Sequence, residues 1–69
     1  MEAFRHSIRI GKDSDVSLVS VAMAKLRAQT EIDEIKATHL ATAASELATN
    51  IAKYARWGTL CFEVERRPA

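Results

Sequence analysis

The sequence predicts a small α+β domain, a two-layer α/β sandwich with the element order β-α-α-β. Two patterns indicate this class. Both ends of the chain alternate between apolar and polar side chains, as half-buried strands do, and the stretch between them repeats its apolar residues at helical spacing. With 69 residues, 48% of them hydrophobic, the chain is long enough for one small globular domain.

The first strand is predicted over residues 3–10. Its side chains alternate between a polar face and an apolar face, and the apolar face consists of Phe4, Ile8 and Ile10. Gly11 interrupts the alternation, and Asp13 or Ser14 can cap the helix that follows.

The first helix is predicted over residues 14–28. One apolar stripe runs along it, formed by Val16, Val19, Met23 and Leu26. Leu18 and Val21 fall outside this stripe. They either cover residual core or make a helix–helix or subunit contact.

The second helix is predicted over residues 33–55, after a polar break in which Thr30 and Asp33 resemble a capping box. Its predicted apolar stripe consists of Leu40, Ala44, Leu47, Ile51 and Ala55. Gly58 follows, and we expect it to form a left-handed cap or a turn.

The last strand is predicted over residues 59–66, with Leu60, Phe62 and Val64 on its apolar face. If the two strands pair, Arg5 and Arg9 meet Glu63 and Glu65, each pair contributing roughly 0.2–1 kcal/mol. Because two strands are too few for a stable sheet, we expect a second chain to complete it, or the chain to be half of a larger fold.

Composition excludes several classes of function. A net charge of +1 without a basic stripe argues against binding to nucleic acid. No apolar run is long enough to span a bilayer and nothing resembles a signal peptide, so we expect no membrane association. A single cysteine, Cys61, rules out a disulfide within the chain and fits a cytoplasmic protein.

The strongest candidate site lies on the second helix. Glu46 and Asn50 are four residues apart and therefore project side by side. Their oxygens are of the kind that Mg²⁺ prefers, and a glutamate beside a metal can act as a general base. From spacing alone, however, a solvated helix face is the favoured explanation, because a glutamate and an asparagine at this spacing are common by chance.

The run Ser45-Glu46-Leu47-Ala48-Thr49-Asn50-Ile51, followed by Tyr54-Ala55 and Gly58, resembles the N box of the GHKL (Bergerat-fold, histidine-kinase-like) ATPases. Within that superfamily the chain is most similar to the serine/threonine kinases of bacterial partner switching. These are the RsbW-like anti-sigma-factor kinases and the RsbT-like switch kinases of the stressosome, which act in stress responses. The order of strands and helices agrees with this resemblance.

The resemblance implies roles for four residues. Glu46 would be the catalytic base, and Asn50 would bind Mg²⁺ that bridges the phosphates of ATP. Lys53 would reach a phosphate, and Tyr54 would lie beside the nucleotide. The alternative without a functional role is that Lys53 is an ordinary surface lysine and that Tyr54 is a packing residue.

The family that this sequence resembles has two further motifs that the sequence lacks. The family binds adenine through an Asp-x-Gly-x-Gly box and closes a glycine-rich lid, whereas this sequence has two glycines. We therefore expect the chain to be the N-terminal, N-box-bearing half of a serine/threonine kinase, inactive by itself. An anti-sigma-antagonist or stressosome-type protein would be its partner.

The alternative is a stand-alone protein–protein interaction module that binds no nucleotide. The open sheet edge and the off-stripe residues Leu18 and Val21 motivate it. This alternative predicts a homodimer, which could be domain-swapped.

Overall fold

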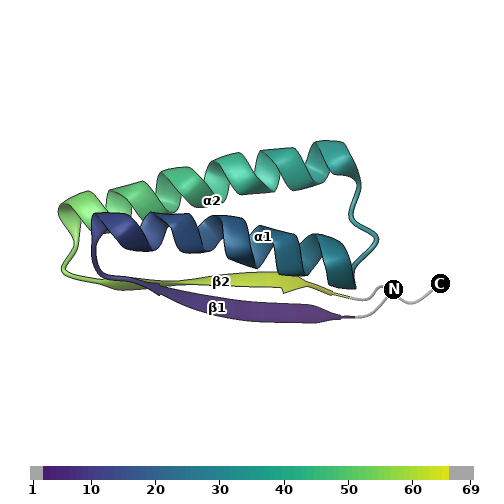
Figure 1. The fold of residues 1–69 in the computed structure, drawn as a ribbon, viewed down its shortest axis with the longest axis horizontal. Coiled ribbons are helices and arrows are strands. Elements are labelled where there is room, and N and C mark those ends of the chain that lie inside the picture. The colour runs from purple at the N-terminus through teal and green to yellow at the C-terminus, as the bar shows by residue number, and fades with distance from the viewer. Residues whose placement is uncertain (1–2, 66–69) are drawn as a thin grey trace.

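A computed structural model describes residues 3–65 and has two layers (Figure 1). The elements follow in the order β1 (Phe4–Ile10), the 3-10 helix η1 (Asp13–Ser17), α1 (Leu18–Gln29), α2 (Glu34–Tyr54) and β2 (Gly58–Val64). The two helices lie on one face of a two-stranded antiparallel sheet, which confirms the predicted α+β class and element order. Among the helices of this described part, none is long and apolar enough to cross a membrane.

The two strands pair along their whole length, from Phe4 opposite Val64 to Ile10 opposite Gly58. This register places Arg5 opposite Glu63, and Arg5 Nε lies 3.3 Å from Glu63 Oε1, as predicted. The charge pair predicted for Arg9 is wrong, because Arg9 lies opposite Thr59.

Arg9 contacts an aromatic ring instead of a carboxylate. Its guanidinium carbon lies 4.5 Å from the centroid of the Trp57 ring. Trp57 precedes the partner of Arg9 by two residues, which is the diagonal position across an antiparallel pair. The predicted extension of the last strand is also too long, since β2 ends at Val64 and residue 66 lies outside the described residues.

The turn between β1 and the helices is held by Asp15. Its Oδ2 accepts hydrogen bonds from the backbone N–H groups of Gly11, at 2.8 Å, and Lys12, at 3.1 Å. The prediction that Asp13 or Ser14 caps this helix start is therefore not what the structure shows. A carboxylate within the first turn reaches back to the preceding amides, as the acidic member of a capping box does.

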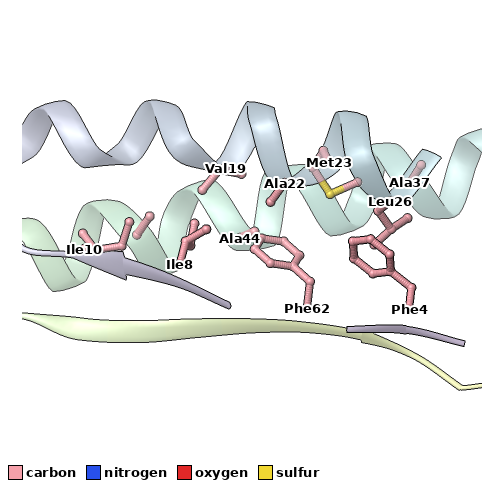
Figure 2. Packing of buried hydrophobic residues seen from close by; sticks show 11 residues of the cluster. Phe4, Ile8, Ile10, Val19, Ala22, Met23, Leu26, Ala37, Ala44 and Phe62 are labelled. Atoms are coloured by element: carbon pink, nitrogen blue, oxygen red, sulfur yellow. The ribbon is translucent and has the colours of Figure 1, made fainter. Parts of the chain in front are cut away.

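The core lies between the sheet and the helices, and Figure 2 shows its packing. Its buried side chains are all apolar: Phe4, Ile8, Ile10, Val19, Ala22, Met23, Leu26, Ala37, Ala44, Ala48 and Phe62. Ile10 and Leu26 are the largest that are fully enclosed. The predicted stripe of the first helix is confirmed, with Val16 half-buried at its start.

The second helix is rotated slightly from the predicted orientation. Leu47 is 53% exposed and Ala55 is exposed, so both predicted core positions are wrong. Ala37 and Ala48 are buried in their place. Because alanine has no side chain beyond Cβ, this face lets α2 approach α1 and the sheet closely.

Two hydrogen-bonding side chains fix the connection between the helices. Thr30 donates from its hydroxyl to the carbonyl of Leu26 at 2.8 Å and so closes the end of α1. Asp33 accepts from the N–H of Ile35 at 2.7 Å and caps α2. Arg27 and Glu34 then join the two helices by an ion pair at 2.8 Å.

Gly58 does not form the left-handed cap expected from the sequence, because no described glycine has a positive φ. It is instead the first residue of β2, packed under α2. A Cβ at Gly58 would lie 3.0 Å from Cγ2 of Ile51. The absence of a side chain therefore lets the helix pack directly onto the beginning of the strand.

Candidate functional site

Glu46 and Asn50 lie one turn apart on the outer side of α2. The Asp33 cap starts this helix, and its 21 residues run on as a single α-helix, so the register from the cap to Asn50 is fixed. Side chains at this spacing have Cβ atoms roughly 5–6 Å apart. Both residues are exposed, so their oxygens are open to a ligand from solvent.

The two side chains border an open depression of about 370 Å³, which is also lined by Ser45 and Thr49. The Thr49 hydroxyl donates to the Ser45 carbonyl at 2.8 Å, which turns this side chain back toward the helix. Within residues 3–65 the lining residues all come from α2, so this part of the chain provides one wall of a possible site.

Ser45 and Thr49 were not among the residues singled out from sequence, although the sequence held a signal for them. They precede Glu46 and Asn50 by one residue each and form the neighbouring row of the helix. Both are half-buried, whereas Glu46 and Asn50 are exposed. The depression therefore has a sheltered hydroxyl-bearing side and an exposed side with the carboxylate and the carboxamide.

Lys53 completes this outer face. It follows Glu46 by seven residues, two helical turns, and is exposed in the last turn of α2. An ammonium group at this position adds positive charge on the side where Asn50 would hold a metal. The structure thus places Glu46, Asn50 and Lys53 on one side of α2, as the sequence predicted.

Tyr54 lies at the edge of this group. It follows Asn50 by four residues, one helical turn, and therefore neighbours it on the surface of α2, and it also lines up with Leu47, two turns earlier. Its side chain is 82% exposed, so the packing role considered from sequence is wrong.

Three other residues with polar or aromatic side chains are exposed and are not among the residues that line this depression. His39 is exposed on α2, and Trp57 is 56% exposed. Cys61 lies on the outer face of the sheet beside Arg5. The pKa of Arg5 is raised by the neighbouring Cys61 side chain and by the nearby carboxylate of Glu63.

The oxygen atoms of Glu46 and Asn50 could contribute to binding a metal ion that is held mainly by a phosphate-containing ligand. No group of three or more His, Cys, Asp or Glu side chains within residues 3–65 could hold a metal ion by itself. Mg²⁺ commonly takes one or two protein oxygens and completes its shell with phosphate and water. Asn50, with Glu46 beside it, fits that limited role.

Comparisons with known proteins do not identify a family or a function for this chain. No protein-family model, no curated protein and no solved structure matches this chain.

Proposed function

We propose that this chain forms the metal-and-base wall of the nucleotide site in an ATP-dependent serine/threonine protein kinase of the GHKL type. The observation that carries the proposal is the placement of Glu46 and Asn50 on one face of α2, where both border the same depression. The element order and the position of the N box on the second helix support it.

The residues of the site would divide the work of phosphoryl transfer. ATP with Mg²⁺ supplies the phosphoryl group when bound. Asn50 would hold the metal through its carboxamide oxygen, and Glu46 would accept the proton of the attacking serine or threonine hydroxyl. Lys53 would balance the charge of the phosphates.

The open shape of the depression supports a second part of this proposal. In the part of the chain that the structure describes, α2 alone borders the depression, and Glu46 and Asn50 are both exposed. Electrostatic groups are most effective where water is excluded. We therefore propose that efficient transfer requires further polypeptide to close over this face, and that the chain alone binds Mg-ATP weakly and turns it over poorly.

The test is the affinity of the chain for Mg-ATP, measured by titration calorimetry or by nitrogen–proton NMR. We expect weak binding that depends on Mg²⁺. Asn50→Ala lowers the affinity by about tenfold, because it removes the metal ligand. Lys53→Ala lowers it less, because its charge lies at the exposed edge of the site.

Lys36→Ala is the matched control for Lys53→Ala, since both are exposed lysines of α2. It removes the same charge from the first turns of the helix and leaves the affinity unchanged. Equal affinities of the wild-type chain and the Asn50→Ala variant would contradict the proposed role of Asn50.

The cellular setting is proposed on the same basis. The partner would be an anti-sigma-antagonist or stressosome-type protein that carries the target hydroxyl, and the location would be the cytoplasm. Neither nucleic acid nor a membrane has a place in this proposal.

A homodimeric binding module without nucleotide is the second candidate function. It is favoured by Leu18 and Val21 of α1, which are 36% and 50% exposed and unsuited to a fully solvated face. Light scattering at micromolar concentration separates the candidates. A dimer that takes up no Mg-ATP supports the module, and a monomer that binds Mg-ATP supports the kinase.

A further inference from the structure

The outer edge of β2 is open on the side away from β1. Within residues 3–65 the sheet has the order β1–β2, so each strand has one hydrogen-bonded neighbour. A strand edge of this kind presents backbone N–H and C=O groups that can pair with another strand. The two open edges of the sheet differ, and that difference identifies the one suited to a partner.

Apolar side chains gather beside the edge of β2. Ile51 points toward β2, because it occupies the space above Gly58. Leu47 lies one turn before Ile51 and is rotated toward the flank of α2 that faces away from α1. It is 53% exposed, and three half-buried residues accompany it in what we call the edge patch: Leu40, Leu47, Leu60 and Val64.

Strand β1 itself leaves less apolar surface uncovered than β2. Its inward-facing apolar residues, Phe4, Ile8 and Ile10, are all buried under the helices. On β2 the corresponding residues Leu60 and Val64 remain half-buried, and only Phe62 is fully covered. Apolar surface is therefore left uncovered on the β2 side, next to backbone groups that can pair.

The spacing of the two layers explains why this surface remains. Packed helices lie about 8–10 Å apart, whereas neighbouring strands lie about 4.8 Å apart. Two helices therefore span more width than two strands, and the flank of α2 extends past β2. A third strand would fit under this flank and cover Leu47.

We infer that the edge of β2 binds an extended segment of another polypeptide, which adds to the sheet as a third strand. The segment would place alternate apolar side chains under the edge patch and pair its backbone with β2. This mode of recognition combines backbone hydrogen bonds, which give affinity, with side-chain contacts, which give specificity.

The charge on β2 defines the chemistry of the other face of that segment. The outward side chains near its end include Glu63 and Glu65, both exposed. On the opposite edge β1 already meets this face with a basic residue, through the 3.3 Å contact between Arg5 and Glu63. The preferred segment therefore alternates apolar residues with arginine or lysine, as β1 itself does.

A folded second copy is a poorer occupant of this edge. If β2 paired with β2 or β1 of another copy in one continuous sheet with all helices on the same side, the strands would be about 4.8 Å apart. The helices above them need about 8–10 Å and would collide with α2. An extended segment without a covering helix avoids this collision.

The test uses a synthetic peptide with the sequence of residues 3–10, which has the required alternation, titrated into the isotope-labelled chain. We expect amide shift changes along Thr59–Val64. Leu47→Glu lowers the peptide affinity by about tenfold or more, because it puts a charge into the apolar contact. Circular dichroism confirms that the variant folds, since Leu47 is not a core residue.

Val21→Glu is the matched control, because Val21 has a similar exposure, 50%, but lies on α1. It leaves the peptide affinity unchanged. A second peptide, with both arginines replaced by glutamate, binds more weakly because it faces Glu63 and Glu65. Three outcomes overturn the inference: no shift changes along β2, equal losses in both variants, or self-association of the chain through this edge.

The proposal of a nucleotide site and the proposal of strand addition at the edge patch can be tested separately. Asn50→Ala leaves peptide binding intact, because Asn50 is not part of the edge patch. Leu47 lies three residues before Asn50 on neighbouring surface of α2, so the edge is tested separately from the nucleotide site by the peptide with both arginines replaced, which changes no residue of the chain. Loss of both activities in Asn50→Ala would indicate a folding defect, which circular dichroism detects.

Discussion

Gly58 shows how one residue fixes the contact between a helix and a strand. A glycine after a helix end commonly adopts the left-handed conformation, so the sequence pattern predicts a left-handed cap or a turn at Gly58. The structure gives it another role, because Ile51 occupies the space that a side chain at Gly58 would need. Sequence patterns report local conformation, and this close approach arises only when α2 and β2 pack together.

Gly58→Ala should therefore destabilise the fold. Its Cβ would lie 3.0–3.3 Å from three atoms of Ile51, and relieving that contact costs on the order of 1–3 kcal/mol. Gly11→Ala is the control, because its Cβ would meet Asp15 Oδ2 at an ordinary 3.6 Å. Urea unfolding followed by circular dichroism compares the two variants. Equal stabilities would contradict the role given to Gly58.

Asp15→Ala should loosen the connection from β1 to α1. It removes the acceptor for the N–H groups of Gly11 and Lys12 and should cost about 1 kcal/mol in the free energy of unfolding. Asp13→Ala removes the same charge two residues earlier and should change stability by less than about 0.5 kcal/mol. A larger loss for Asp13→Ala would show that Asp13, as predicted from sequence, is the cap.

The second helix shows why element positions can be predicted more accurately than the faces they bury. The predicted span, 33–55, is within one residue of the observed Glu34–Tyr54 at each end, because Asp33 marks the start and the polar break precedes it. The predicted face was displaced toward Leu47, since leucine outranks alanine in any hydrophobic pattern. Close packing instead selected Ala37, Ala44 and Ala48.

Ala48→Leu should destabilise the protein because it overfills that packed face. Ala48 is 0% exposed, and inserting a larger side chain into a packed core costs about 1–3 kcal/mol. Ala43→Leu makes the same change at an exposed position of the same helix and should be nearly neutral. Thermal unfolding measures both, and a stable Ala48→Leu variant would show that the helix is less tightly packed than described.

At the scale of the whole molecule, the fold class and the order of elements follow from the periodicity of the sequence. Both strands and the second helix lie close to where the alternating and helical patterns predict them, whereas residues 14–17 of the predicted first helix belong to the 3-10 helix η1 and the α-helix begins at Leu18. The pairing register could not be read from the sequence, because it depends on how the strands align, and it gave Arg9 an aromatic neighbour in place of a carboxylate.

The candidate site was predicted in part for a related reason. Helical spacing alone placed Glu46, Asn50 and Lys53 on one side of α2, and the structure has them there. The exposure of Tyr54 and of Leu47 depends on which side of the helix meets the sheet, and only tertiary packing determines that side. The same packing leaves apolar surface beside β2 and a polar face above the helix layer.

The most direct test of the proposed nucleotide site is paramagnetic broadening by Mn²⁺-ATP in the nitrogen–proton NMR spectrum of the chain. Mn²⁺ replaces Mg²⁺ at oxygen ligands and broadens nearby amides. The proposed site predicts the greatest loss of signal along Ser45–Lys53, centred on Asn50 and reduced at the same Mn²⁺-ATP concentration in the Asn50→Ala variant. Broadening that is centred instead on Asp13 and Asp15, or that is undiminished in the Asn50→Ala variant, would contradict it.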